Sequence, residues 1–307
     1  MFGKKKTIAV IEIDGVISAS SKKSAIASKG FSLGKTLEFL SDIEDEKQAL
    51  DGIMLRMNTP GGTAGASEEL ARAIERVKEA RNVPVVASIA DVCCSGGYMI
   101  AVVADKIFAN RQSLTGSIGT ILQVPNYQEL AEKIGVKTLT FKSGKMKDIG
   151  NPMRDMTEDE QAFLNEIARQ GHKLFRDFVK SHRPAIQNEE DMMDGRPVDA
   201  LTAKENGLID AFGTYLDAYD AMRELAGIGK HAPVKELRIK EDKGIVQRLL
   251  GTIAFPNVVD AIEELSLSGR IYFSGCCRKS ILSAQRQAAY SFSSANARSR
   301  AASSFSA

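Results

Sequence analysis

Short apolar runs alternate with amphipathic stretches in the first half of this 307-residue chain, and this alternation limits its possible folds most strongly. Residues 7–13, 52–58 and 84–90 are rich in β-branched and apolar side chains and are bounded by turn residues, which is typical of strands. Between the last two, residues 66–80 repeat apolar side chains at helical spacing, with charged residues on the opposite face. Strands that alternate with helices predict an α/β fold, in which helices cover a largely parallel sheet.

The second half of the chain is predicted to be mainly helical. Thr157 and Glu160 have the spacing of a capping box, which would open a long amphipathic helix. Further predicted elements are strands at 107–109, 118–122 and 137–141, and helices at 33–48, 96–104, 200–206, 215–225 and 243–250. We therefore expect an α/β core over residues 1–150 and a mainly helical part over 151–270 that completes the domain. Residues 271–307, a basic tail of Ser, Ala and Arg, are expected to be disordered.

The charge of the chain is unevenly distributed. The whole chain carries +2, but six basic and no acidic residues follow residue 267, which leaves −4 on residues 1–267. A mildly acidic body is no nucleic-acid surface, so no nucleic-acid partner is expected. The sequence has no run of 18 apolar residues, and its start is too short and too polar for a signal peptide. The expectation is a cytoplasmic protein, with peripheral membrane contact through Lys4, Lys5 and Lys6 left open.

The four cysteines form two adjacent pairs, Cys93-Cys94 and Cys276-Cys277. Adjacent cysteines cannot easily ligate one tetrahedral ion, and secreted disulfide scaffolds are shorter and richer in cysteine. Reduced thiols in a reducing compartment are therefore expected. No metal or cofactor is predicted.

A serine stands where the third predicted strand gives way to a small apolar helix. Ser95 could simply cap that helix, since serine is a preferred N-cap residue. Gly96 and Gly97 after it would also let a ligand approach the backbone closely. Another strand ends in Pro60-Gly61-Gly62, which is either an ordinary turn or a second source of N–H groups facing Ser95. Two N–H donors from different loops are what an acyl-transfer site needs to stabilise an oxyanion.

The base that would activate such a serine is harder to choose. The three histidines, His172, His182 and His231, all lie in the helical half, so a Ser-His-Asp triad is poorly supported. A lysine can serve as the base if it is neutral at the working pH. Lysines cluster at residues 142–147, after a predicted strand, but a solvated loop explains such a cluster equally well. The residues alone leave this choice open.

Four motifs in sequence order carry a resemblance that bears on this choice. They are N-T-P-G-G at 58–62, S-G-G-Y at 95–98, L-T-G-S-I-G at 114–119 and K-S-G-K-M-K-D-I at 142–149. Together they resemble the signature of signal peptide peptidase A and its relatives, a Ser/Lys peptidase family of the Clp protease and crotonase superfamily. The resemblance runs from about residue 7 to residue 225 and implies that superfamily's repeated strand-strand-helix core, with a helical C-terminal extension.

The resemblance also implies roles for individual residues. Ser95 corresponds to the nucleophile and Lys147 to the general base, and Ser117 matches a serine expected to orient that lysine. The main-chain N–H groups that match the oxyanion hole are those of Gly96 and of Gly61 or Gly62. A serine endopeptidase of signal peptides or other unfolded apolar peptides is implied, with oligomer contacts made by the helical part. The expected partners are peptide substrates and further copies of the chain.

Two departures from the family pattern bear on the active site. Cys93 and Cys94 stand where relatives have small residues such as alanine, and a thiol there could make the site sensitive to oxidation or alkylation. The chain is also about half the length of two-repeat members, so one chain should carry one dyad. Two alternatives remain: a crotonase-like acyl-CoA enzyme that uses the same oxyanion hole, and an inactive scaffold of the same fold.

Overall fold

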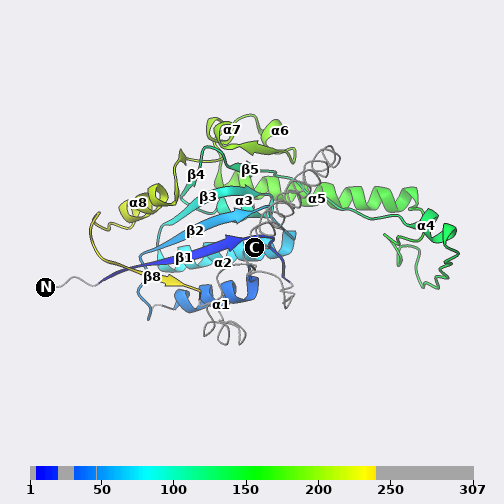
Figure 1. Cartoon of the computed structure of the whole chain (residues 1–307), viewed down its shortest axis with the longest axis horizontal. Coiled ribbons are helices and arrows are strands. Elements are labelled where there is room, and N and C mark those ends of the chain that lie inside the picture. Colours follow the sequence, from blue (N-terminus) through cyan, green and yellow to red (C-terminus); the bar gives the residue numbers. More distant parts are fainter. Residues whose placement is uncertain (1–4, 20–30, 46, 240–307) are drawn as a thin grey trace, which may run out of the picture. The chain divides into compact units, whose positions relative to one another are not determined.

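In the computed structural model, which describes residues 5–19, 31–45 and 47–239, the three apolar runs form adjacent parallel strands (Figure 1). They are β1 (Lys6–Asp14), β2 (Gly52–Thr59) and β3 (Val85–Cys94). Most of their side chains are buried, because helices cover both faces of the sheet, as is usual for parallel strands. The predicted α/β class is confirmed.

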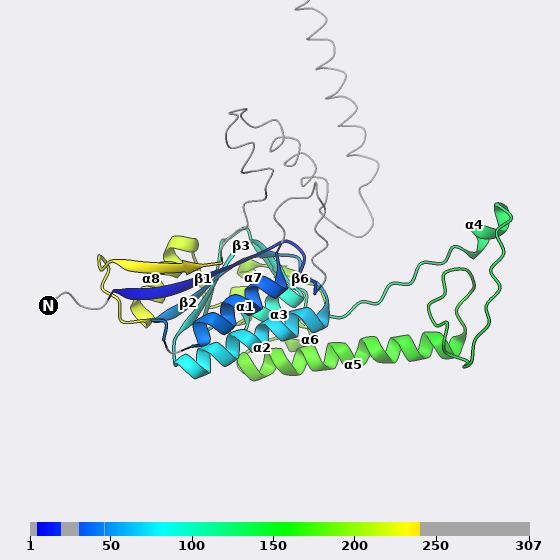
Figure 2. The ribbon, with the colours of Figure 1, turned by 90° about the horizontal axis from the view of Figure 1, so that it is seen from below.

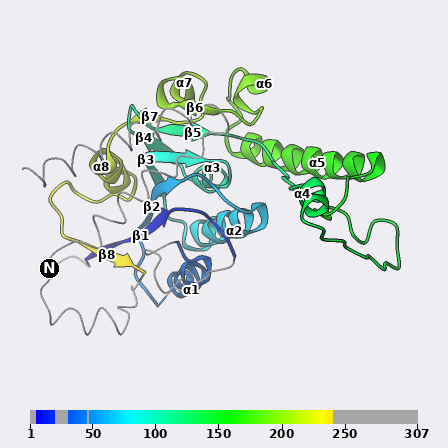
Figure 3. The same cartoon turned by 45° about the vertical axis from the view of Figure 1, so that its right-hand side comes forward.

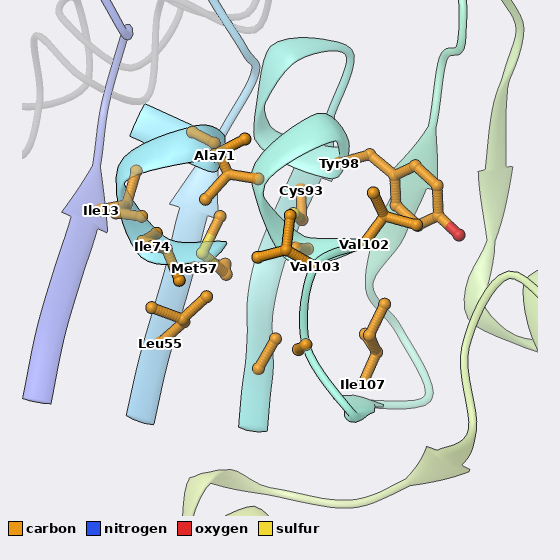
Figure 4. Packing of buried hydrophobic residues seen from close by; sticks show 14 of the residues in the cluster. Ile13, Leu55, Met57, Ala71, Ile74, Cys93, Tyr98, Val102, Val103 and Ile107 are labelled. Atoms are coloured by element: carbon orange, nitrogen blue, oxygen red, sulfur yellow. The ribbon is translucent and has the colours of Figure 1, made fainter. Parts of the chain in front are cut away.

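Alternate residues of these strands belong to two separate hydrophobic cores, since successive side chains of a strand point to opposite faces. On one face, Ile11 and Leu55 belong to the larger core. The helices that cover this face are α1 (Leu33–Glu44), α2 (Ala64–Arg81) and α3 (Gly96–Ala101). Figure 4 shows part of this core, in which α2 and α3 lie over β2 and β3.

On the other face, Val10 and Met54 pack against Met222 in a smaller core. Met222 belongs to α8 (Tyr215–Leu225), which lies across the sheet from α1 and α2 (Figure 3). The strands are therefore held from both sides.

Five further strands complete the sheet, and three of them come from beyond residue 150. They are β4 (Lys106–Ala109), β5 (Leu114–Gly116), β6 (Pro197–Asp199), β7 (Ala211–Phe212) and β8 (Val234–Arg238). The sheet runs in the order β6-β5-β3-β2-β1-β8, while β4 pairs with both β3 and β7. All pairs are parallel except β5 with β6. All described residues belong to one compact unit, Met1–Glu241.

The long helix α5 (Glu158–His182) begins at the predicted capping box. The Glu160 N–H donates to Thr157 Oγ1 (3.3 Å), and the Thr157 N–H donates to the Glu160 carboxylate (2.9 Å). Only the later part of the helix joins the core, where Phe175 and Val179 are buried. Shorter helices are α4 (Gln128–Lys133), α6 (Glu189–Met192) and α7 (Ala200–Glu205).

Two predicted strands are wrong. Residues 118–122 and 137–141 form no strand, because the chain leaves the sheet after β5. Residues 120–157, which we call the arm, extend past the sheet to the start of α5 (Figure 2). Apolar side chains such as Ile121 and Phe141, 75% and 93% exposed, have no neighbouring strand to pack against there.

β3 extends four residues beyond its predicted end and stops at Cys94. An irregular register between β2 and β3 accommodates the polar Asp91 inside the strand, where the sequence suggested a stop. The helix expected at 243–250 and the tail at 271–307 lie outside the described residues. Among the helices that are described, none has the length and apolar character to cross a membrane.

Candidate active site

Ser95 occupies a strained turn between β3 and α3. Its φ of 53° is positive, which non-glycine residues rarely adopt without support from the surrounding structure. That support comes from β5, because the Ser95 N–H donates to Gly116 O (2.8 Å). A serine on a strained strand-to-helix turn is the arrangement that presents a nucleophilic hydroxyl in many hydrolases.

The Ser95 hydroxyl is not used for helix capping. Ser95 stands at the N-cap position of α3, yet its side chain makes no capping hydrogen bond. No described residue hydrogen-bonds its Oγ, and the residue is only partly buried. The hydroxyl is therefore free to react.

The Pro60-Gly61-Gly62 turn lies directly against Ser95. Gly61 has a φ of 103°, and a Cβ added to it would lie 2.8 Å from Ser95 Cβ and 2.9 Å from Gly96 N. Only glycine fits so close to the turn that carries the serine. The Gly61 N–H is already bound, since it donates to Thr59 Oγ1 (3.0 Å).

Two unpaired backbone N–H groups converge beside Ser95. Ile17 binds the residues on either side of Gly62. The Ile17 N–H donates to Gly61 O, and Ile17 O accepts from the Thr63 N–H, each at 2.9 Å. Neither Gly62 N nor Gly96 N has an acceptor within the described part of the chain. A Cβ added to Gly96 would lie 3.4 Å from Gly62 N, so the two residues pack against each other. Of the two turn glycines, Gly62 is thus the one with a donor to offer.

Ser117 lies just after β5, next to the residue that holds Ser95. Its φ is 52°, and its N–H donates to Arg196 O (2.9 Å). Its hydroxyl donates to Gly195 O (3.0 Å). In this structure the hydroxyl binds the backbone of a neighbouring loop and does not contact a lysine.

Lys147 is in the arm and is not brought to Ser95 of the same chain. The arm is tied to the first turn of α5 through the ion pair between Arg154 and Glu160. Glu160 precedes Phe175, the first apolar residue of α5 in the core, by about 22 Å along the helix at 1.5 Å per residue. Figure 2 shows the arm beyond the sheet, at the start of α5 and away from α3. Lys147 is exposed, and no described residue hydrogen-bonds its ammonium group.

The two cysteines before Ser95 are packing residues in this structure. Cys93 is fully buried and Cys94 is 8% exposed, and both are free thiols. Burial raises the pKa of Cys94 to about 11 and raises that of Cys93 well above its ordinary value. A thiol that stays protonated is a poor nucleophile. Both side chains thus behave as small apolar packing residues.

Three residues support the site without having been predicted as site residues, although Thr59 lies in the N-T-P-G-G motif. Thr59 binds the Gly61 N–H, Ile17 binds the residues on either side of Gly62, and Ser67 of α2 lies against Gly96 while donating to Thr63 O (3.0 Å). Threonine and serine hydroxyls near turns are common, and Ile17 reaches the site only through β1 lying beside β2. A pattern of residue types could not have distinguished them.

A serine hydroxyl on a strained turn, beside two N–H groups that have no acceptor among the described residues, is typical of hydrolases of the serine class. The model of peptidase family S49 matches residues 77–229. A Methanocaldococcus jannaschii protein named as a protease is 35% identical over 210 residues, or 68% of this chain and 66% of that protein. An Enterococcus faecium protein named as signal peptide peptidase SppA is 33% identical over 71% of this chain and 63% of its own length. A Synechocystis protein named as a protease is 33% identical over 80% of this chain and 84% of its own length.

The chain belongs to peptidase family S49, a family of serine peptidases that includes signal peptide peptidase A. It has the α/β fold that the resemblance predicted. It spans about two thirds of the length of the archaeal and enterococcal relatives.

Proposed function

We propose that this protein is a serine endopeptidase that hydrolyses signal peptides or other unfolded, apolar peptide segments. The observation that carries the proposal is the free Ser95 hydroxyl beside the unpaired N–H groups of Gly62 and Gly96. The substrate class is supported by the name of the enterococcal relative.

The proposed reaction uses an acyl-enzyme. The neutral amine of Lys147 accepts the Ser95 proton while Oγ attacks the scissile carbonyl carbon. The resulting oxyanion accepts hydrogen bonds from Gly62 and Gly96, each typically worth about a hundredfold to a thousandfold in rate. Lys147 then gives its proton to the leaving amine as the peptide C–N bond breaks. Water, deprotonated in turn by Lys147, hydrolyses the ester and restores the Ser95 hydroxyl.

This reaction requires Lys147 to reach a serine, and we propose that it serves Ser95 of a second copy of the chain. The distance along α5 and the outward direction of the arm support this proposal. The Ser117 hydroxyl would then give up its hydrogen bond to Gly195 O and form one with the Lys147 amine, which would orient the incoming lysine.

Exposed apolar side chains support the association of copies. The arm and the outer half of α5, residues 158–170, expose large apolar side chains. Leaving such side chains in water costs free energy. They are Ile121, Leu122, Leu130, Ile134, Val136, Leu139, Phe141, Phe163 and Ile167. A groove of about 440 Å³ lies between residues 120–124 and α5 and offers a further contact surface to a neighbouring copy.

The test is hydrolysis of fluorogenic peptides with small or apolar P1 residues by the wild type, Ser95→Ala and Lys147→Ala. Both variants should lose about a thousandfold or more in kcat, because each removes a group that acts directly on the reacting atoms. Wild-type activity should rise towards alkaline pH, since the base acts only when neutral. Lys133→Ala is the control: it is another exposed lysine of the arm, and its ion pair with Glu129 stays within α4, so activity should stay within about twofold.

Two results would contradict the proposal. Full activity in Ser95→Ala would exclude Ser95 as the nucleophile. A wild type that leaves every peptide intact but binds acyl-CoA would favour the crotonase-like alternative.

A further inference from the structure

The loop that carries Lys147 is closed by its own hydrogen bonds. The Lys142 ammonium group donates to Lys145 O (3.1 Å) and to the Asp148 carboxylate (2.6 Å), which lie on either side of Lys147. The Lys147 N–H donates to Gly144 O (3.1 Å). The backbone at Lys147 is therefore fixed, although its side chain is exposed.

Arg154 connects this loop to α5. It donates to the Asp148 carboxylate through Nε (3.0 Å) and to Asp148 O through Nη2 (3.2 Å). Its Nη1 and Nη2 donate to the two oxygens of Glu160, at 2.8 and 2.5 Å, and Nη1 also donates to Asp155 O (2.9 Å). A guanidinium has five N–H groups, and these five bonds use them all.

Glu160 lies in the first turn of α5, so its bonds with Arg154 attach the loop to a rigid helix. Its side chain is 2% exposed, and it belongs to the capping box with Thr157 that starts α5. The hydrogen bonds from Arg154 lower the pKa of Glu160 to about 2 and hold the pKa of Asp148 well below its ordinary range. Both carboxylates therefore stay charged at neutral pH, and the connection persists there.

We propose that Arg154 is a positioning residue for Lys147: it fixes the loop of the general base to the first turn of α5. The inference rests on the proposed function of Lys147. It explains why an arm with almost no buried side chains has a dense polar network at this one place. A catalytic group displaced by about 1 Å can lose about a hundredfold in rate, so a base on a loose arm would be ineffective.

An arginine is needed because one side chain must bind two carboxylates at once, those of Asp148 and Glu160. Its planar fork binds Glu160 through two parallel bonds while Nε binds Asp148. A lysine has a single ammonium centre and cannot hold both carboxylates in this geometry. Arg154→Lys should therefore rescue only part of the function.

The kinetic test compares Arg154→Ala and Asp148→Asn with the wild type. Asp148→Asn leaves Glu160 and the capping box intact, so it weakens the loop connection without disturbing α5. Both variants should lower kcat by about tenfold or more and leave KM within about twofold, because Arg154 acts through Lys147 and not on the peptide. Added guanidinium ion should restore part of the kcat of Arg154→Ala and none of that of Lys147→Ala.

Two control variants separate positioning from stability. Arg169→Ala removes an arginine of α5 that pairs with Glu166 of the same helix, and kcat should not change. Thr157→Ala removes the cap hydroxyl but keeps the bonds from Arg154 to Asp148 and Glu160. If Thr157→Ala lowers kcat as much as Arg154→Ala at an equal loss of thermal stability, the role of Arg154 is structural and the inference is overturned. An unchanged kcat in Arg154→Ala overturns it as well.

A readout without catalysis keeps this inference separate from the proposed function. Trypsin should cleave after Lys145 or Lys147 faster in Arg154→Ala than in the wild type and in Arg169→Ala, because the loop is released. Equal cleavage rates would overturn the inference even if the wild type hydrolysed no peptide.

Discussion

The backbone of Gly61 packs directly against the turn that carries the candidate nucleophile. Its positive φ and the nearby Cys94 carbonyl leave no room for a side chain, since an added Cβ would lie 2.7 Å from that oxygen. The same turn brings Gly62 beside Ser95. At the scale of single residues, the site thus depends on backbone positions as much as on side chains.

Gly61→Ala should therefore impair both stability and activity. The added methyl group would push the turn away from Ser95, which misplaces the Gly62 donor, and kcat should fall by about a hundredfold or more. The melting temperature should fall too, because an alanine is strained at this φ. Gly65→Ala is the matched control: it lies in α2, with no atom within 4 Å of an added Cβ, and should retain full activity. Wild-type activity in Gly61→Ala would show that the turn is not part of the site.

The sequence identified some of these residues and not others, for physical reasons. Ser95 and Pro60-Gly61-Gly62 stand at ends of recognisable strands, and the carboxyl ends of adjacent parallel strands meet at one edge of a sheet. Lys147 could be chosen only through the family resemblance, because its place in space is set by the arm and α5. The Thr59 hydroxyl binds the Gly61 N–H, so Gly62 is the turn glycine that can donate to an oxyanion. This choice depends on side-chain geometry, which the sequence does not give.

Among the elements, α5 best connects local sequence to the site. Its capping box was predicted from two residues, and the same Glu160 carboxylate holds Arg154 and hence the loop of Lys147. The predicted strands in the arm failed because a β-rich sequence forms a strand only when a neighbour can pair with it. The early end predicted for β3 failed because the register irregularity that accommodates Asp91 is a property of two strands together.

The hydrogen bonds that Glu160 accepts from Arg154 and, to a smaller extent, from Thr157 predict a pH dependence of stability. Glu160 has a folded pKa of about 2, below the ordinary 4.5, so the folded state favours the charged carboxylate. Its contribution is fully present above about pH 4.5 and is lost as pH falls from there to about 2. The melting temperature should therefore fall across this window less steeply in Glu160→Gln than in the wild type, with Asp148 supplying part of the remaining slope.

Glu158→Gln is the control for this experiment. Glu158 lies on the same turn of α5 and makes no hydrogen bond through its side chain within the described residues. Its variant should follow the wild-type profile. Parallel profiles for Glu160→Gln and the wild type would contradict the assignment of this acid-sensitive contribution to Glu160.

At the scale of the whole molecule, the described residues fall into two regions of different character. The sheet and its helices bury their apolar residues, whereas the arm and the outer half of α5 expose theirs. The part with the free serine and the part with the candidate base are held apart by a rigid helix. Both observations favour a working unit made of several copies, in which the arm of one chain meets the sheet of the next.

The most direct test of this account is complementation between two inactive variants. Ser95→Ala and Lys147→Ala would be co-expressed with different affinity tags, and assemblies that carry both tags would be purified. If one copy supplies Ser95 and a neighbour supplies Lys147, randomly mixed assemblies of equivalent sites should recover about a quarter of wild-type activity. Assemblies that contain both chains yet stay as inactive as either variant alone would contradict a Ser95–Lys147 dyad shared between copies.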